Sequence, residues 1–302
     1  MKVQELERNG LKLFILENDW LRVEVFPAAG GKITSLVNKK LNKEFLWHNN
    51  DLPLQKCETG ADYDSNFWGG IDELLPNDIP ELVDLLSYPD HGELWTTALN
   101  CEVSENKIIL HGIMSISGLL YEKEISLVDD EPSVICRYRI KNTTAEKRHF
   151  LWKQHAALQI SEGDYLKSSA IKAKGVDSSS NRLQSTAEFE WPVQEGIDFA
   201  QVPPKQGAMD FFYLYDTQVG EMSLLSENGA HRFTYSYDKN VFPFEWYFAS
   251  YGQFRGHYVA ILEPATAMPV SVAEAAKLAQ CTVLAPAEEL KTTINLYAGL
   301  NI

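Results

Sequence analysis

The chain has 302 residues, of which 45% are hydrophobic and 11% are aromatic, so it can bury a large core. All-β chains often form one domain of roughly 200–250 residues, and we therefore expect a single domain over the whole chain, 1–302. The formal net charge of −15 disfavours nucleic acid and anionic membranes as partners, because binding either needs a basic protein face.

The sequence pattern predicts neither a targeting signal nor a membrane span. Its first residues lack the apolar run of a signal peptide, and no later stretch approaches the length of a membrane span. The four cysteines form no C-x-x-C pair, which disfavours a zinc knuckle or a redox site. We therefore expect a cytoplasmic protein with free thiols. Motifs for ATP, NAD, serine hydrolysis and zinc proteases are also missing.

The first part of the chain predicts an antiparallel sheet. Leu21, Val23 and Val25 alternate with charged residues, and a second apolar run follows at residues 33–37. The segment 48–95 then loses this pattern and is rich in Gly, Pro, Asp and Asn, although its Pro-Glu-Leu-Val-Asp-Leu-Leu stretch is typical of a short helical turn. A long irregular segment inside a compact domain often carries function.

The rest of the chain also predicts mainly strands. They are expected at residues 107–116, 121–127, 134–140, 150–160, 211–215, 222–226, 232–237 and 258–263. Residues 163–205 are weakly patterned and resemble surface excursions. A short helix is expected at 271–280, and a closing hairpin at 281–284 and 291–299. Because the strands do not alternate with helices and no repeat occurs, the fold class is an all-β, large antiparallel sandwich.

The strand at 150–160 separates into two faces when it is read with a period of two. The apolar face carries Phe150, Trp152, Ala156, Leu158 and Ile160. Lys153, His155 and Gln159 fall on the opposite face, where they can line a concave polar site. The alternative for His155 is a partly buried structural residue.

Three further positions are candidates for chemistry. His91 precedes Gly92 in a loop rich in aromatic residues, although a turn stabilised by that glycine explains it equally. Glu263 ends an apolar strand, where partial burial would raise the pKa of its carboxyl towards that of a useful base. An exposed strand end is the alternative. Asp210 can bind a hydroxyl or belong to an ordinary turn.

The order of these pieces resembles the aldose 1-epimerase (galactose mutarotase) superfamily. The resemblance is carried by His91-Gly92, His155 within a strand, Asp210 before an aromatic run, and Glu263 at a strand end. The stretch Ala-Gly-Gly-Lys-Ile-Thr-Ser-Leu at 29–36 is similar to that family's glycine-led opening strand. Residues 68–76 are similar to its divergent branches.

The resemblance implies a β-supersandwich with few short helices and a shallow sugar cleft on the concave face of one sheet. It implies that Glu263 is the general base, that His155 is the general acid, and that His91 polarises the sugar near its ring oxygen. The family's Asn-Arg pair is not found ahead of His91, and Arg255 or Lys153 are candidates to replace its cation. The expected substrate-binding residues are Asp210, Lys153, Trp95, Asp72, Glu73 and Arg255.

The function implied by the resemblance is an aldose 1-epimerase (mutarotase) that interconverts the α and β anomers of a hexose by acid/base ring opening. This chemistry requires no metal or organic cofactor. Two alternatives stay open: a non-catalytic carbohydrate-binding protein, and a hexose-6-phosphate 1-epimerase that would need cations at the cleft. The expected partner is a small sugar, without nucleic acid or membrane, and the protein is expected to be a monomer or homodimer.

Overall fold

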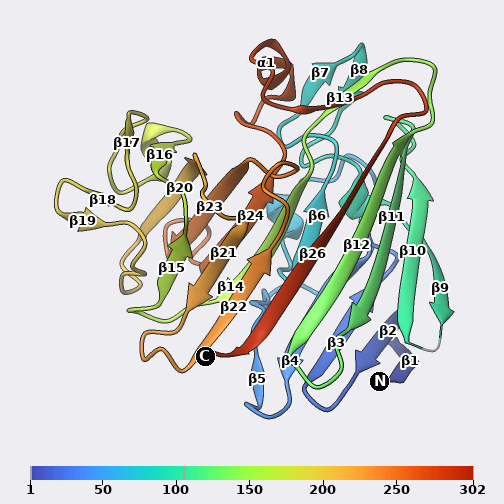
Figure 1. Cartoon of the computed structure of the whole chain (residues 1–302), viewed down its shortest axis with the longest axis horizontal. Helices are drawn as coiled ribbons and strands as arrows, with labels where there is room; N and C mark the ends of the chain where they lie inside the picture. The colour runs from blue at the N-terminus through green and yellow to red at the C-terminus, as the bar shows by residue number, and fades with distance from the viewer. Residues whose placement is uncertain (1, 105, 302) are drawn as a thin grey trace.

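Two antiparallel β-sheets packed face to face make up most of the computed structural model, which describes residues 2–104 and 106–301 (Figure 1). The larger sheet contains, in spatial order, β1 (Lys2–Arg8), β2 (Leu11–Glu17), β3 (Leu21–Phe26), β4 (Lys32–Asn38), β6 (Ile71–Leu74), β14 (Lys153–Gln159), β24 (Tyr258–Ala265), β23 (Phe244–Tyr251), β20 (Ala208–Tyr215), β16 (Lys172–Gly175) and β17 (Glu188–Glu190), with β5 (Lys43–Glu44) paired to β4.

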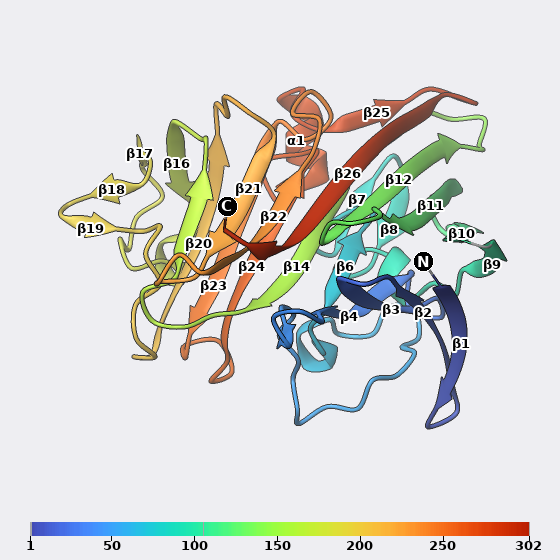
Figure 2. The same cartoon turned by 60° about the horizontal axis from the view of Figure 1, so that its bottom comes forward.

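The smaller sheet covers one face of the larger sheet. It contains, in spatial order, β15 (Tyr165–Ser168), β21 (Glu221–Leu225), β22 (His231–Ser236), β26 (Glu289–Leu300), β12 (Ser133–Asn142), β11 (Leu119–Leu127), β10 (Lys107–Ile113) and β9 (Asn100–Ser104). The long strands β26 and β12 run diagonally across the view in Figure 2. The main hydrophobic core lies between the two sheets and takes residues from both.

Short elements lie at the ends of the sandwich. They are the strand pairs β7 (Glu81–Val83) with β8 (Leu86–Tyr88), β13 (Arg148–Phe150) with β25 (Thr282–Leu284), and β18 (Val193–Gln194) with β19 (Ile197–Asp198), the helix α1 (Val272–Lys277), and the 3-10 turns η1 (Asp64–Asn66), η2 (Leu94–Thr96) and η3 (Ser178–Ser180). Figure 1 shows α1, β7, β8 and β13 together at one end. In the part of the chain that the structure describes, no helix is long and apolar enough to cross a membrane.

Strict alternation of side chains explains why β11 and β12 pack against the larger sheet. Every second residue of β11 from Leu119 to Leu127 is buried, and β12 follows the same period. The period brings one charged residue inward, because Lys123 falls on the buried face of β11. Its ammonium lies 2.6 Å from a carboxylate oxygen of Glu73 on β6, which also accepts a hydrogen bond of 2.8 Å from the hydroxyl of Tyr138.

Most expected elements are confirmed, and the all-β antiparallel class is correct. The strands β3 and β4 pair as predicted, and β10 to β12, β20 to β22 and β24 match expected strands within a few residues. The expected helix is α1, whose first turn is capped by Ser271. The strand expected at 150–160 is divided into β13 and β14, and the end of β13 pairs with β25 instead of the large sheet.

Two local expectations are wrong. The stretch expected to form a helical turn is the β7–β8 hairpin, because Asp84 and Leu85 both adopt the positive φ angles that such tight two-residue turns need. The expected closing hairpin does not form, since β25 pairs with β13 while β26 pairs with β12 and β22. Strand β23 was not expected from the sequence. Both of its faces are buried, so its sequence has no alternation.

We expect the Lys123→Met substitution to lower the free energy of unfolding by about 3–5 kcal/mol, because it leaves the buried Glu73 carboxylate without its cation. Chemical denaturation at neutral pH measures this loss. The matched control is Lys12→Met, since the Lys12–Glu5 pair is exposed on both sides and should change the stability by less than about 1 kcal/mol. Equal losses for the two variants would contradict the role given to the buried pair.

Candidate active site

Adjacent strands place a row of functional side chains on the face of the larger sheet that points away from the smaller sheet. Asp72 of β6 lies opposite His155 of β14, and Glu263 of β24 lies opposite Trp246 of β23. The constant register between β14 and β24 also puts Glu263 opposite His155. We call these four residues the polar row. They share one face because side chains of neighbouring strands in register point the same way.

A second row lies two residues further along each strand and is apolar. This apolar row consists of Ala157, Ile261, Phe248 and Phe211 on β14, β24, β23 and β20. A pyranose presents hydroxyls at its edge and C–H groups on its faces. A surface with one polar and one apolar row matches that distribution, as ligand pockets with few polar groups on an apolar lining do.

A pocket of about 270 Å³ lies over the two rows. Residues of the sheet in its lining are Lys153, His155, Met209, Phe211, Phe248, Ile261 and Glu263. Residues of the connecting segments are Tyr63, Asp64, Phe67, Asp78, His91, Asp177, Ser180 and Phe254. The structure thus brings His91, His155 and Glu263 together, although they are far apart in the sequence, and adds Lys153 to them.

Lys153 and two carboxylates form the charged centre of the pocket. The Lys153 ammonium lies 2.5 Å from Glu263 Oε2 and 2.7 Å from Asp78 Oδ1, and all three side chains are almost fully buried. Burial raises the pKa of Glu263 to about 7, although Lys153 opposes the rise. Burial alone would lower the pKa of Lys153, but Asp78 and Glu263 outweigh it and raise that pKa. The pocket therefore holds a permanent cation beside a carboxyl that titrates near neutrality.

His155 is held as a neutral imidazole. Burial, followed by the positive charge of Lys153, lowers the pKa of His155 well below its ordinary value. The hydroxyl of Tyr63 donates to Asp72 at 2.8 Å and lies 3.3 Å from Nδ1 of His155. Because the Tyr63 proton goes to the carboxylate, Nδ1 of His155 carries a hydrogen and donates to the Tyr63 oxygen. Its Nε2 is then free to accept a hydrogen bond.

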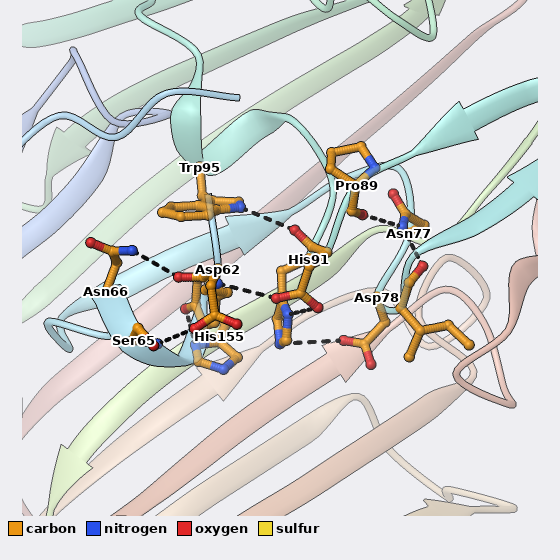
Figure 3. A network of polar contacts seen from close by, with 12 residues as sticks. Asp62, Ser65, Asn66, Asn77, Asp78, Pro89, His91, Trp95 and His155 are labelled. Carbon is orange, nitrogen blue, oxygen red and sulfur yellow. Dashed lines mark hydrogen bonds and ion pairs between the residues drawn. The ribbon is translucent and has the colours of Figure 1, made fainter. Parts of the chain in front are cut away.

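His91 is the imidazole that favours the charged form. Its Nδ1 lies 3.0 Å from Asp90, and its Nε2 lies 4.0 Å from Asp78 (Figure 3). Burial alone would lower the pKa of His91, but the hydrogen bond to Asp90 and the charge of Asp78 outweigh it and raise the pKa. The ring stacks on Tyr63 with a centroid distance of 4.1 Å.

The backbone around His91 fixes the direction of its ring. His91 has a φ of 55°, and its N–H donates to the carbonyl of Asp78 at 2.7 Å. The next residue is Gly92, where an added Cβ would clash with the carbonyl oxygen of Leu75. The tight turn therefore requires Gly92, and the same turn places His91 in the pocket.

The other expected binding residues lie outside the pocket lining. Asp72 sits behind it and pairs with Lys32 at 3.1 Å, while Trp95 packs edge-on against Tyr63. Arg255 is exposed on a loop near Asp62. Each has a place close to the pocket without forming its wall.

Glu73 and Asp210 point in the opposite direction, into the space between the sheets, so neither of these expected binding residues lines the pocket. Glu73 is adjacent to Asp72 and therefore falls on the other face of β6. It pairs with Lys123. Asp210 lies between two residues that line the pocket, and its carboxylate is buried against the guanidinium of Arg182 at 2.7 Å. Alternation along a strand explains both corrections.

Several pocket residues were missed in the sequence. Asp78 and Tyr63 lie in the irregular segment 48–95, whose aromatic and acidic content was the signal available. Phe211 and Phe248 become recognisable only when the register with His155 and Glu263 is known. Among residues 2–104 and 106–301, no group of three or more His, Cys, Asp and Glu side chains is arranged to hold a metal ion.

Comparisons with known proteins identify the fold. No model of a protein family and no curated protein matches the chain. Among solved structures, a galactose mutarotase-like protein from Clostridium acetobutylicum has a TM-score of 0.73 at 14% identity, covering 99% of this chain and 98% of its own. A proposed aldose 1-epimerase from Escherichia coli K12 has a TM-score of 0.72 at 16% identity, covering 96% and 100%. The chain therefore has the galactose mutarotase-like fold.

We expect Lys153→Met to raise the pKa of Glu263 above about 7, because the Lys153 charge opposes the protonated form of that carboxyl. Carbon-13 NMR titration of the glutamate carboxyls measures this pKa directly. Lys174→Met is the matched control, since Lys174 lies over Tyr213 on the same sheet but is outside the pocket lining. An unchanged or lower Glu263 pKa in Lys153→Met would contradict the pairing of these two groups.

Proposed function

We propose that the protein is an aldose 1-epimerase that interconverts the α and β anomers of an unphosphorylated hexose. The observation that carries this proposal is a single pocket holding one carboxyl that titrates near pH 7, one imidazole that favours its charged form, and one neutral imidazole. Ring opening needs one group that accepts a proton and another that donates one. The fold shared with mutarotase-like proteins supports the same conclusion.

Glu263 is the general base of the proposed mechanism. As the bond between C1 and the ring oxygen breaks, Glu263 takes the proton of the C1 hydroxyl. The oxygen of that hydroxyl becomes the aldehyde oxygen. The C1–C2 bond then rotates, and ring closure on the other face of the aldehyde returns the proton from Glu263 to O1. A group with a pKa of about 7 suits this task because it must both accept and release a proton in each cycle.

His91 is the proposed general acid. The sequence analysis expected this role for His155, so the proposal exchanges the roles of the two histidines. The ring oxygen needs a proton while the ring opens, and a protonated imidazole at His91 supplies it. When the ring closes on the other face, the same oxygen returns this proton to His91. Asp90 and Asp78 favour that form at His91, whereas burial and Lys153 disfavour it at His155. His155 instead offers Nε2 as an acceptor for a sugar hydroxyl and orients the ring.

The charges of the pocket favour a neutral sugar over a sugar phosphate. Its lining contains the carboxylates of Asp64, Asp78, Asp177 and Glu263 but only one lysine and no arginine. The lysine is already shared between two carboxylates. A phosphate dianion would need free cations, so a hexose-6-phosphate is the weaker candidate substrate.

We expect Glu263→Gln to reduce the rate of anomer exchange by roughly 10²–10⁴-fold, the usual contribution of one positioned proton transfer. Two-dimensional exchange NMR on several hexoses measures the rate, and titration calorimetry checks that the sugar still binds. Glu190→Gln, on the exposed face of β17, is the matched control. Undiminished exchange in Glu263→Gln removes Glu263 from the mechanism. Binding without exchange in the unmodified protein would identify a carbohydrate-binding protein instead.

The proton positions on the two histidines give a separate test. We expect nitrogen-15 NMR to find that His91 loses its second proton at a higher pH than an ordinary imidazole, and that His155 is neutral at pH 7 with hydrogen on Nδ1. The pH profile of kcat/KM should rise as Glu263 ionises near pH 7 and fall as His91 loses its proton. His91→Gln should lack that fall, whereas His111→Gln, on the smaller sheet, should keep it. A protonated His155 beside a neutral His91 would restore the assignment expected from sequence.

A further inference from the structure

A second hollow, of about 560 Å³, adjoins the pocket. Met209 lines both spaces, and the turn η3 lies between them, with Ser180 facing the pocket and Ser178 facing the second hollow. We propose that this hollow, here called the outer groove, binds a second sugar unit. On the proposed function, the substrate is then the reducing-end unit of a neutral oligosaccharide.

The register places the outer groove at the end of the pocket furthest from the proton-transfer groups. Along β20, Tyr213 extends the polar row, Phe211 belongs to the apolar row, and Met209 lies two residues beyond. At about 3.3 Å per residue, the four residue steps from Tyr213 to Met209 span roughly 13 Å. This length exceeds one pyranose ring, so a sugar reacting at Glu263 leaves the groove available for a second unit.

The polar groups of the outer groove suit uncharged hydroxyls. Its lining includes two serines and the carboxamides of Asn181, Gln184 and Gln253. The only charged side chain in that lining is Arg182, whose guanidinium is bound to the buried carboxylate of Asp210. Hydroxyls and carboxamides both donate and accept hydrogen bonds, as sugar hydroxyls do. A phosphate would find no free cation here.

Part of this polar surface is available to a ligand. Within the described residues, the side chains of Ser178 and Gln184 make no hydrogen bond, and both are exposed. Gln253 donates from Nε2 to the carbonyl of Ser179 at 3.2 Å, which leaves its carbonyl oxygen as an acceptor. Three polar groups from two separate segments of the chain therefore border the same open space.

The wall of the groove is held in place before any ligand arrives. Asp177 accepts hydrogen bonds from the backbone of Ser179 at 2.7 Å and Ser180 at 3.1 Å. The carboxamide of Asn181 donates to the carbonyls of Asp177 and Ser185. A rigid wall lowers the ordering cost of binding, so even a few neutral hydrogen bonds add to affinity.

The chemistry of mutarotation sets the direction of the oligosaccharide. The C1 hydroxyl of the reacting unit must be free, because its proton is removed during ring opening. The second unit is therefore joined through a hydroxyl other than the one at C1. The reacting sugar is the reducing end, and the rest of the chain runs past Met209 into the outer groove.

The test compares kcat/KM for anomer exchange of glucose with that of maltose and isomaltose, and of galactose with that of lactose. We expect at least one disaccharide to exceed its own reducing-end monosaccharide by about tenfold, the equivalent of about 1.4 kcal/mol. In Ser178→Trp, which fills the groove, this ratio should fall to about one. Ser87→Trp, on the exposed face of β8 outside both hollows, should keep the ratio of the unmodified protein. Gln253→Ala removes one acceptor and should lower the ratio in part. This variant tests the groove if Ser178→Trp does not fold.

The possible failures separate the groove from the proposed function. If monosaccharides are exchanged and every ratio is close to one, the outer groove is not a sugar site and the epimerase proposal stands. If no sugar is exchanged, the epimerase proposal fails, and titration calorimetry with the same sugars decides on the groove. Tighter binding of a disaccharide that is lost in Ser178→Trp supports the groove, and equal binding of all sugars overturns it.

Discussion

A single buried ammonium group is the interaction on which the pocket depends. Lys153 lies between Glu263 and Asp78, and buried charges are tolerated only when they are paired closely. One cation cannot neutralise two carboxylates, so the pair is left with an excess negative charge. A proton on Glu263 or on the neighbouring His91 reduces that excess. The near-neutral pKa of Glu263 follows mainly from burial, which raises it against the opposing charge of Lys153, and Asp78 adds a smaller rise.

The two faces of the larger sheet carry different polar structures that depend on the same register. On β6, Asp72 supports the pocket through Tyr63, while the adjacent Glu73 binds Lys123 from the other sheet. A shift of β6 by one residue would exchange these two side chains between the faces. The buried Glu73–Lys123 pair therefore fixes the register of β6, and this register places Asp72 where it accepts the hydrogen bond of Tyr63 beside His155.

Sequence patterns predicted the parts of the fold in which one face is buried and the other is solvated. The strands β10, β11 and β12 of the smaller sheet alternate clearly, but β23 is covered on both faces and has no such pattern. Glu263, His155 and His91, which line one pocket, were proposed from the sequence because each stands out within its own segment. Glu73 and Asp210 lie outside the pocket, which the sequence could not show, because only the register decides on which face of a strand a carboxylate lies. Pairing of β25 and β26 with distant strands is likewise a property of the whole sheet.

The asymmetry between the two histidines follows from the segments that carry them. The positive charges of Lys153 and His91 both lower the pKa of His155, so the two imidazoles and the ammonium do not all carry charge together. The loop of His91 brings its own carboxylate, Asp90, whereas the strand of His155 brings Lys153. Tyr63 joins them, since its ring stacks on His91 and its hydroxyl faces His155. The charged imidazole is therefore His91 on the loop, and His155 on the strand supplies the neutral nitrogen that accepts a hydrogen bond.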